Sequence, residues 1–312
     1  MRSDPPRPPV PPQLILDLSR LVFAAWSRTP TGIPRVELAY AEHLIATAAD
    51  RLHFTVLDAF RRLRSVDGRL AIRFVREIAG YWEGDVGSTR AYLRIVLLAL
   101  WIHTVLILRP WGDLRRLVAA HGGRSIYVIP SQLQIEHSSL IAGPKAAGDL
   151  KLVYFVHDIL PSLMPANFPD GAEDRNRGRM ENAARLADAI IVNSWATAVS
   201  FKERLGRDMA PEKLVVAPLG ITRCRKVDVS HQPPTEPYLV MLGTIEPRKN
   251  HLLVLNLWRE LYAEHGQETP RLLLVGSRGW KNRHIIEMMG ETHPLAARSR
   301  SWDDCPMRRS LA

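Results

Sequence analysis

Short apolar runs recur along the chain between Gln13 and Gly220 and alternate with stretches whose hydrophobic residues repeat at helical spacing. Val- and Ile-rich runs of this length are typical of strands buried in a parallel sheet, and the intervening helices would cover its two faces. We therefore expect an α/β fold with a doubly wound sheet. The expected strands are QLILDLS (13–19), FTVLDAF (54–60), SIYVIP (125–130), KLVYFVHD (151–158), AIIVNS (189–194) and KLVVAPLG (213–220).

A second, shorter α/β segment follows a break in the pattern. Residues 221–237 have no regular period and hold three prolines, which is typical of a linker. Beyond them only two strands are expected, YLVML and RLLLV, whereas a doubly wound domain needs roughly four to six. The expected organisation is a disordered Pro-rich lead-in (1–12), a Rossmann-like domain (13–225), a linker (226–237), a partial second domain (238–290) and an unstructured tail (291–312).

One stretch is more apolar than the rest of the chain. The fourteen residues from Ile95 to Leu108 include only His103 and Thr104 as polar residues. This run is shorter than the roughly 20 residues that span a bilayer. Three interpretations remain open: a helix of the core, a helix on a membrane surface, or a true span. In the second, residues 91–111 would contact the membrane, and Arg90, Arg94 and Arg109 would flank the apolar run.

Charge and cysteine content limit the kinds of partner, metal site and disulfide that the chain is expected to have. The chain of 312 residues carries a formal charge of +10, which favours an anionic partner. Nucleic acid is disfavoured, because the arginines are scattered and no DNA- or RNA-binding motif is present. The two cysteines, Cys224 and Cys305, have no metal-ligand spacing, so we expect neither a metal nor a disulfide. The lead-in lacks the apolar core of a secretory signal, and we expect a cytoplasmic protein, free or peripheral on the inner face of the membrane.

The turn GTIEPRKN, Gly243 to Asn250, joins an apolar strand to the amphipathic stretch HLLVLNLWREL. A helix N-terminus presents unpaired N–H groups and a partial positive charge, and Asn250 suits the N-cap position. Gly243 would let a ligand approach the backbone, and Arg248 and Lys249 add two cations. The pattern indicates a diphosphate site, with a solvated basic connection as the alternative.

Five segments stand out along the chain: TGIPRVE (31–37), YFVHDILPSLMPANFP (154–169), IIVNSWATAVSF (190–201), and VMLGTIEPRKNHLLVLNLWREL with RLLLVGSRGW (240–280). These segments resemble, in family order, motifs of the retaining glycosyltransferases of family 4, also called glycosyltransferase group 1, in their mannosyltransferase-like branch. The resemblance implies a GT-B architecture of two Rossmann-like domains. It also implies transfer of a sugar, with retention, from a nucleotide-sugar donor to a glycan or lipid-linked acceptor, without a metal or other cofactor.

On the donor side, the resemblance implies that Arg248 and Lys249 neutralise the diphosphate and that Gly243 and Thr244 contact it closely. Departure of a nucleoside diphosphate develops negative charge, which fixed cations stabilise as it forms.

In the first domain, the resemblance places His157 as a catalytic residue near the reacting sugar, with Asp158 holding its turn. Gly32 and Arg35 would lie in the loop–helix region beside acceptor and donor. Three of these residues have a structural alternative. His157 would be a histidine that ends a strand, Asp158 an aspartate that caps a turn, and Gly32 a residue that serves only the turn by adopting a positive φ. Val36, Tyr40 and Leu44 are expected to share one face of the following helix.

The family also carries an E-x7-E segment whose acidic residues bind the donor's sugar and ribose, and none follows Trp280. We therefore expect a truncated chain that is inactive or weakly active. The alternative function is a non-catalytic fragment that binds acceptor or membrane.

Overall fold

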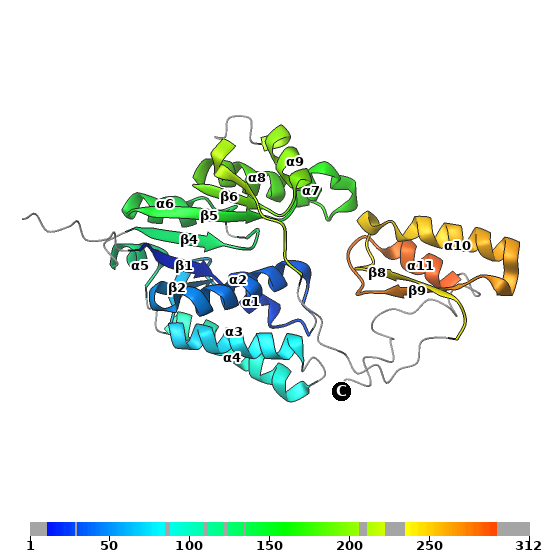
Figure 1. Ribbon diagram of the computed structural model, residues 1–312, viewed down its shortest axis with the longest axis horizontal. Coiled ribbons are helices and arrows are strands. Elements are labelled where there is room, and N and C mark those ends of the chain that lie inside the picture. Colours follow the sequence, from blue (N-terminus) through cyan, green and yellow to red (C-terminus); the bar gives the residue numbers. More distant parts are fainter. Residues whose placement is uncertain are drawn as a thin grey trace, which may run out of the picture. The chain divides into compact units, whose positions relative to one another are not determined.

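The chain forms two compact units in the computed structural model (Figure 1). Unit 1 combines Met1–Ile159 with Arg177–Leu219, and unit 2 combines Leu160–Asn176 with Gly220–Ala312. The expected division differs here, because it kept 160–176 within the first domain. The structure describes residues 11–28, 30–84, 88–108, 112–120, 124–133, 135–205, 211–221 and 235–291. Most of the expected lead-in and linker, and all of the tail after residue 291, lie outside these ranges.

Unit 1 is built on a seven-stranded sheet in the order β3-β2-β1-β4-β5-β6-β7. All neighbours are parallel except β2 and β3, and Leu16 of β1 aligns with Phe54 on one side and Val128 on the other. The predicted α/β fold with a doubly wound parallel sheet is confirmed. The strands are β1 (Gln13–Asp17), β2 (Leu52–Leu57), β3 (Leu63–Val66), β4 (Ser125–Ile129), β5 (Leu150–Val156), β6 (Ala189–Val192) and β7 (Leu214–Val216).

The antiparallel edge strand β3 was not predicted, because its sequence, LRSV, has no apolar run. A hairpin held by the buried carboxylate of Asp58 creates it. That carboxylate accepts hydrogen bonds from the backbone N–H groups of Phe60 and Arg62 at 2.8 and 2.9 Å, and from the side chains of Arg62 and Arg64. Arg61 at the tip adopts a left-handed φ of 57°.

Helices cover the sheet of unit 1 and form two hydrophobic clusters with it. One cluster joins β1 and β2 to α1–α4, and the other joins β4–β6 to α5, α6, α8 and α9 (Figure 1). The helices are α1 (Ser19–Ala24), α2 (Gly32–Ala48), α3 (Gly68–Glu83), α4 (Thr89–Leu108), α5 (Leu114–Ala120), α6 (Ser139–Ala147), α8 (Ala172–Leu186), which crosses the boundary between the units, and α9 (Trp195–Leu205).

The apolar stretch forms α4, a helix of 20 residues rather than 14. By length and composition it could cross a membrane, with a mean hydropathy of 2.1 in its most apolar window. One side packs into the core through Ile95, Ala99, Ile102 and Leu106. The core interpretation therefore holds for one face of the helix, whereas the opposite face is exposed.

Unit 2 contains a parallel pair of strands, β8 (Tyr238–Leu242) and β9 (Arg271–Val275), with α10 (His251–His265) and α11 (Arg283–Glu291). Within residues 235–291 these are the two strands that the sequence predicts. A small core gathers around Leu255, Trp258 and Leu274.

The segment 160–176, which contains α7 (Leu160–Leu163), is tied to the loop after β9. Trp280 stacks on Phe168 with ring centroids 5.7 Å apart, and its Nε1 donates to the Asn167 carbonyl at 2.8 Å. Lys281 pairs with Asp170 at 3.0 Å. These contacts explain why the segment groups with unit 2.

Candidate functional site

In unit 1 the candidate residues gather where the neighbouring parallel strands β1, β4 and β5 end. His157 directly follows β5 and is buried. Its Nε2 lies 2.7 Å from the carbonyl oxygen of Pro130, so Nε2 carries the proton and donates it. The ring stacks on Phe155, with centroids 4.4 Å apart. The carboxyl edge of an open α/β sheet is where ligands bind, and His157 is fixed there.

The environment of His157 favours the neutral ring. Burial lowers its pKa, while the hydrogen bond to Pro130 and the charge of Asp158 oppose that shift. A neutral ring that donates from Nε2 keeps Nδ1 as an acceptor, which could receive a hydrogen bond from a hydroxyl group. Asp158 is half-buried, and its backbone carbonyl accepts from Gln132 Nε2 at 2.6 Å, which joins the turn after β5 to the one after β4.

Sequence reasoning missed Asp17, a fully buried carboxylate at the end of β1. It accepts hydrogen bonds from the backbone and side chain of Ser19, and from the hydroxyl of Tyr127 at 3.0 Å and of Thr55 at 3.5 Å. Burial raises its pKa to about 6 against these hydrogen bonds. The only signal in the sequence was an acidic residue at the end of a predicted strand, since its partners come from distant strands.

Glu37 was also missed, although it belongs to the segment TGIPRVE. Its carboxylate is fully buried, and Oε1 accepts a hydrogen bond from the Leu21 backbone N–H at 3.0 Å. Burial and the charge of Asp17 raise its pKa well above the usual value, and Arg20 opposes this. Glu37 thus links α2 to the first turn of α1, where a carboxylate is favourable.

The prediction for α2 was partly wrong. Pro34 lies in the first turn as expected, but Gly32 already belongs to the helix and its φ is not positive. Val36, Tyr40 and Leu44 share a half-buried face of α2 as expected, and the fully buried positions beside them include Leu38 and Ala41.

A cavity of about 270 Å³ opens beside the start of α2. Gly32 lies between two of its lining residues, whereas Arg35 is exposed and does not line it. The basic residue of this cavity is Arg20, whose pKa is lowered by burial and by Arg179 and raised by Glu37. The lining residues are Arg20, Phe23, Ala24, Ser27, Thr31, Pro34 and Leu133.

In unit 2 the structure brings Gly243 and Lys249 together. Gly243 follows β8 with a φ of +153°, which favours glycine. A Cβ at this position would lie 3.9 Å from the Lys249 side chain, which is otherwise exposed. A second glycine was not singled out: a Cβ on Gly276, after β9, would lie 1.9 Å from the Gly243 carbonyl oxygen. The two strand ends can approach only because position 276 has no side chain.

The remaining residues of the basic turn have protein partners. Arg248 Nε lies 2.5 Å from the buried carboxylate of Glu246, so part of its charge is offset. Burial raises the pKa of Glu246, and Arg248 and Lys249 oppose this. Thr244 packs toward Gly279, where a Cβ would lie 2.8 Å from its methyl group. Asn250 is the N-cap of α10 as predicted, but it is left-handed, with a φ of 56°, and its side chain makes no cap hydrogen bond.

The candidate residues therefore form two groups in different units, one around His157 and one around Lys249. Among the residues that the structure describes, no three His, Cys, Asp or Glu side chains form a metal-ligand cluster.

A stretch of the chain is similar in sequence to a curated glycosyltransferase. In an alignment of 165 positions that covers 48% of this chain, it is 26% identical to the serotype-specific mannosyltransferase WbdA of Escherichia coli. The chain spans about a fifth (20%) of the length of that relative. No family model matches the chain.

Solved structures give weaker similarities. A TarM variant from S. aureus, in complex with fondaparinux, α-GlcNAc-glycerol and UDP, aligns with 57% of this chain and 32% of its own, at 14% identity and a TM-score of 0.36. The pneumococcal O-GlcNAc transferase GtfA, in complex with UDP and GlcNAc, aligns with 60% of this chain and 36% of its own, at 12% identity and a TM-score of 0.41. TM-scores this low do not establish a common fold, and the architecture above rests on the chain's own strand order.

Proposed function

We propose that this chain is a glycosyltransferase of the retaining family 4 (group 1) type with GT-B architecture, transferring a sugar from a nucleotide-sugar to a glycan or lipid-linked acceptor. The observation that carries the proposal is the sequence similarity to a mannosyltransferase over 48% of the chain. The order of the motifs along the chain and the placement of the candidate residues at strand ends support it.

On the donor side, the basic turn of unit 2 binds the diphosphate. Gly243 leaves the backbone accessible, Lys249 lies beside it with an exposed ammonium, and Thr244 completes the turn. As the nucleoside diphosphate departs, Lys249 and the backbone N–H groups that begin α10 stabilise its growing charge. Arg248 contributes less than Lys249, because Glu246 already offsets its charge.

In unit 1, His157 positions the transferred sugar. Its Nε2–H is fixed on Pro130, so Nδ1 accepts from a sugar hydroxyl, and Asp158 holds the turn that carries the ring. The cavity lined by Arg20 holds part of the acceptor, and Gly32 and Arg35 contribute from the start of α2, next in sequence to its lining residues Thr31 and Pro34.

We expect no metal or other cofactor in this reaction, because the cations of the basic turn neutralise the diphosphate. The protein acts in the cytoplasm, free or peripheral on the inner face of the membrane, and nucleic acid is not a partner.

A second candidate is a non-catalytic role in binding acceptor or membrane. The exposed apolar face of α4 favours it, because Leu93, Leu97 and Trp101 are each more than half exposed.

A transfer assay tests the proposal. UDP-glucose, UDP-N-acetylglucosamine and GDP-mannose, each radiolabelled in the sugar, are incubated with the full chain and with polyprenyl-phosphate-linked glycans in the presence of EDTA. Transfer of label from at least one donor, at a low rate and with the donor's anomeric configuration kept, is expected. His157→Ala should lower the rate about 100-fold or more, within the range for a positioned polar group. Lys202→Ala, on the exposed surface of α9, serves as control. Absence of transfer and of donor binding from a folded chain would favour the second candidate.

A further inference from the structure

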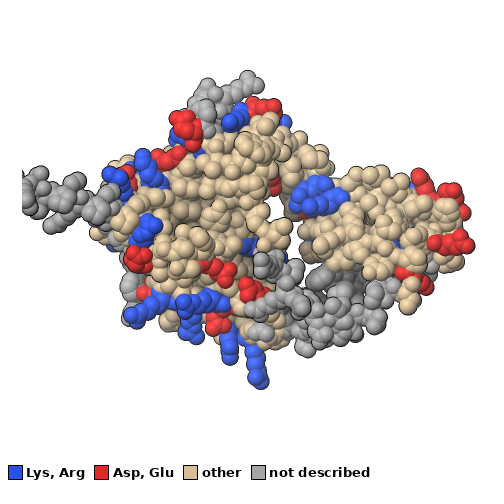
Figure 2. Space-filling view, in the orientation of Figure 1, with Lys and Arg blue, Asp and Glu red and all other residues tan. Residues whose placement is uncertain are grey.

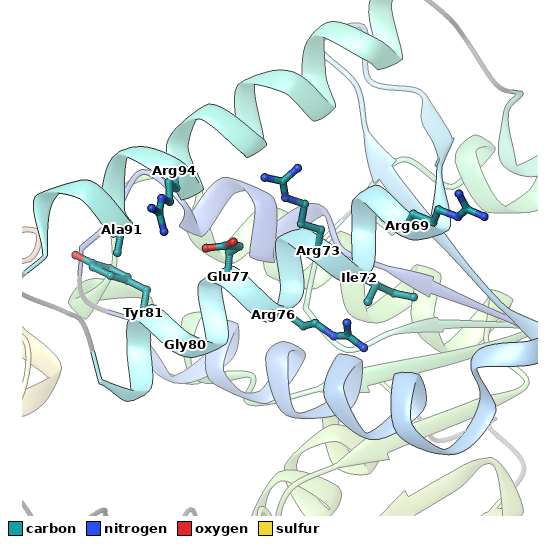
Figure 3. A pocket seen from close by; sticks show the side chains of 9 residues that line it. All are labelled: Arg69, Ile72, Arg73, Arg76, Glu77, Gly80, Tyr81, Ala91 and Arg94. Atoms are coloured by element: carbon teal, nitrogen blue, oxygen red, sulfur yellow. The ribbon is translucent and has the colours of Figure 1, made fainter.

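Arginines gather on one side of α3 and continue onto α4. Arg69, Arg73 and Arg76 are spaced four and three residues apart on α3, so they share its exposed face. With Arg94 of α4 they line a cavity of about 520 Å³ (Figure 3). Arg73 and Arg94 are directed into the space between the two helices, whereas Arg76 points away from α4 (Figure 3).

The charge of this arginine groove is unbalanced. Four arginines and one acid, Glu77, line it, which gives a formal charge of +3. Among the described residues, none of these four arginines is paired with a carboxylate within 4.0 Å. Figure 2 shows basic side chains projecting from the edge of unit 1 where α3 and α4 lie. Unpaired guanidinium groups at this density favour an anionic ligand, and their planar forks suit phosphate oxygens.

Beside the groove, α4 carries a stripe of exposed apolar side chains. Leu93, Leu97, Leu100, Trp101 and Leu108 repeat at helical spacing and are between 45% and 74% exposed. Thr104 is a polar residue within the stripe. Its hydroxyl donates a hydrogen bond to the backbone carbonyl of Leu100 at 2.9 Å, so it needs no partner in water. An apolar stripe of this length is unfavourable in water and indicates a partner.

The stripe and the groove are adjacent, because α3 packs against α4 and Arg94 of the groove directly follows Leu93 of the stripe. Membrane-surface helices have this arrangement: apolar side chains enter the boundary between headgroups and acyl chains, while arginines meet lipid phosphates. A transmembrane position for α4 does not fit, since Ile95, Ala99, Ile102 and Leu106 on its other face belong to the core of unit 1.

We propose that α3 and α4 form a docking surface that holds unit 1 on an anionic lipid bilayer, with the stripe at the acyl boundary and the arginine groove on lipid phosphates. A second copy of the chain fits less well, because pairing this surface with itself would oppose two groups of charge +3. A soluble phosphate would occupy the groove alone and leave the stripe in water.

Vesicle flotation of the full chain tests the proposal. Vesicles of phosphatidylcholine alone are compared with vesicles containing equal parts of phosphatidylcholine and phosphatidylglycerol. We expect binding to the anionic vesicles, weakened by salt, and little binding to the neutral ones. Arg73→Glu with Arg94→Glu should lower the partition coefficient at least about 25-fold, since each cation near the surface contributes about fivefold.

Two further variants make the result specific. Lys202→Glu with Arg204→Glu on α9 makes the same change of charge on other exposed residues of unit 1 and should keep most of the binding. Leu97→Ser with Trp101→Ser should weaken binding while leaving the groove charge intact. Circular dichroism confirms that each variant is folded.

Four results would overturn the proposal. They are equal flotation with neutral and anionic vesicles, equal loss in the α9 control, no flotation by the wild type, or self-association in sedimentation velocity that Trp101→Ser abolishes without any binding to vesicles. None of these readouts depends on sugar transfer, so the docking surface and the proposed activity fail separately.

Discussion

Strands β5 and β8 have similar sequences, KLVYFV and YLVML, and yet differ in burial. In β5, Leu152, Tyr154 and Val156 are completely buried between strands β4 and β6 and the covering helices. In β8, Leu239, Val240 and Leu242 are 51%, 54% and 79% exposed, and β9 is the one neighbour within the described sheet. An apolar run therefore predicts a strand, whereas the elements that cover it decide how much free energy it contributes.

The difference extends to the candidate residues. In unit 1, His157, Asp17 and Glu37 are buried and held by partners from neighbouring strands and helices. In unit 2, Lys249 is exposed and stands beside a strand end whose geometry depends on two glycines. The candidate residues of unit 1 are therefore held by several protein contacts, whereas the Lys249 side chain is open to solvent.

The largest expected effect compares the two strands directly. Leu152→Ala should lower the free energy of unfolding of unit 1 by about 2–5 kcal/mol, because it leaves a cavity in a packed core. Leu239→Ala should cost less than about 1 kcal/mol, since half of that side chain is already in water. Urea unfolding followed by circular dichroism measures both. Similar costs for the two variants would mean that β8 is covered in solution as β5 is.

The buried carboxylates of unit 1 should make stability depend on pH. Asp17 has a pKa of about 6 in the folded chain and about 3.8 when unfolded, so the folded state holds a proton that the unfolded state releases. Stability should therefore fall as pH rises from about 4 to 6, by no more than about 3 kcal/mol, and Glu37 acts in the same direction. The melting temperature measured across this range should show a slope that Asp17→Asn reduces.

Asp58→Asn is the matched control for this slope. Burial alone would raise the pKa of Asp58, but hydrogen bonds from Arg62 and Arg64 bring it below the usual value. The stability that Asp58 contributes is present above its unfolded pKa. It is lost as the pH falls through the lower pKa of the folded chain. Asp58→Asn should leave the slope above pH 4 unchanged, and an equal effect of the two variants would refute the assignment to Asp17.

A smaller effect separates two glycines. Gly276→Ala places a Cβ against the Gly243 backbone, which must shift, and we expect unit 2 to lose about 1–3 kcal/mol of stability. Gly32→Ala has open space around the new Cβ and an ordinary φ, so stability should stay unchanged or rise by less than about 1 kcal/mol. Thermal unfolding of the two variants checks this. Unchanged stability of Gly276→Ala would mean that the ends of β8 and β9 lie farther apart in solution than in this structure.

Local patterns predicted local structure well. The sequence WATAVSFKERL forms α9 over Trp195–Leu205 as expected, and the expected strand before His157 forms β5. Strand β3 could not be predicted, because the Asp58 hairpin rather than an apolar run creates it. Asp17 and Glu37 were missed for a related reason. Burial of an acid depends on partners that are distant in sequence, and Tyr127 is 110 residues from Asp17.

The central claim is that the basic turn of unit 2 binds the diphosphate of a nucleotide-sugar. Calorimetric titration of UDP and GDP into the full chain tests this claim most directly. One of the two should bind, and Lys249→Ala should weaken that binding about ten- to a hundredfold through loss of a charge-assisted contact. Arg259→Ala, an exposed cation on α10 outside the turn, should leave it unchanged. Equal binding by the wild type and Lys249→Ala, or no binding of either nucleotide, would contradict the claim and leave the turn as a solvated connection.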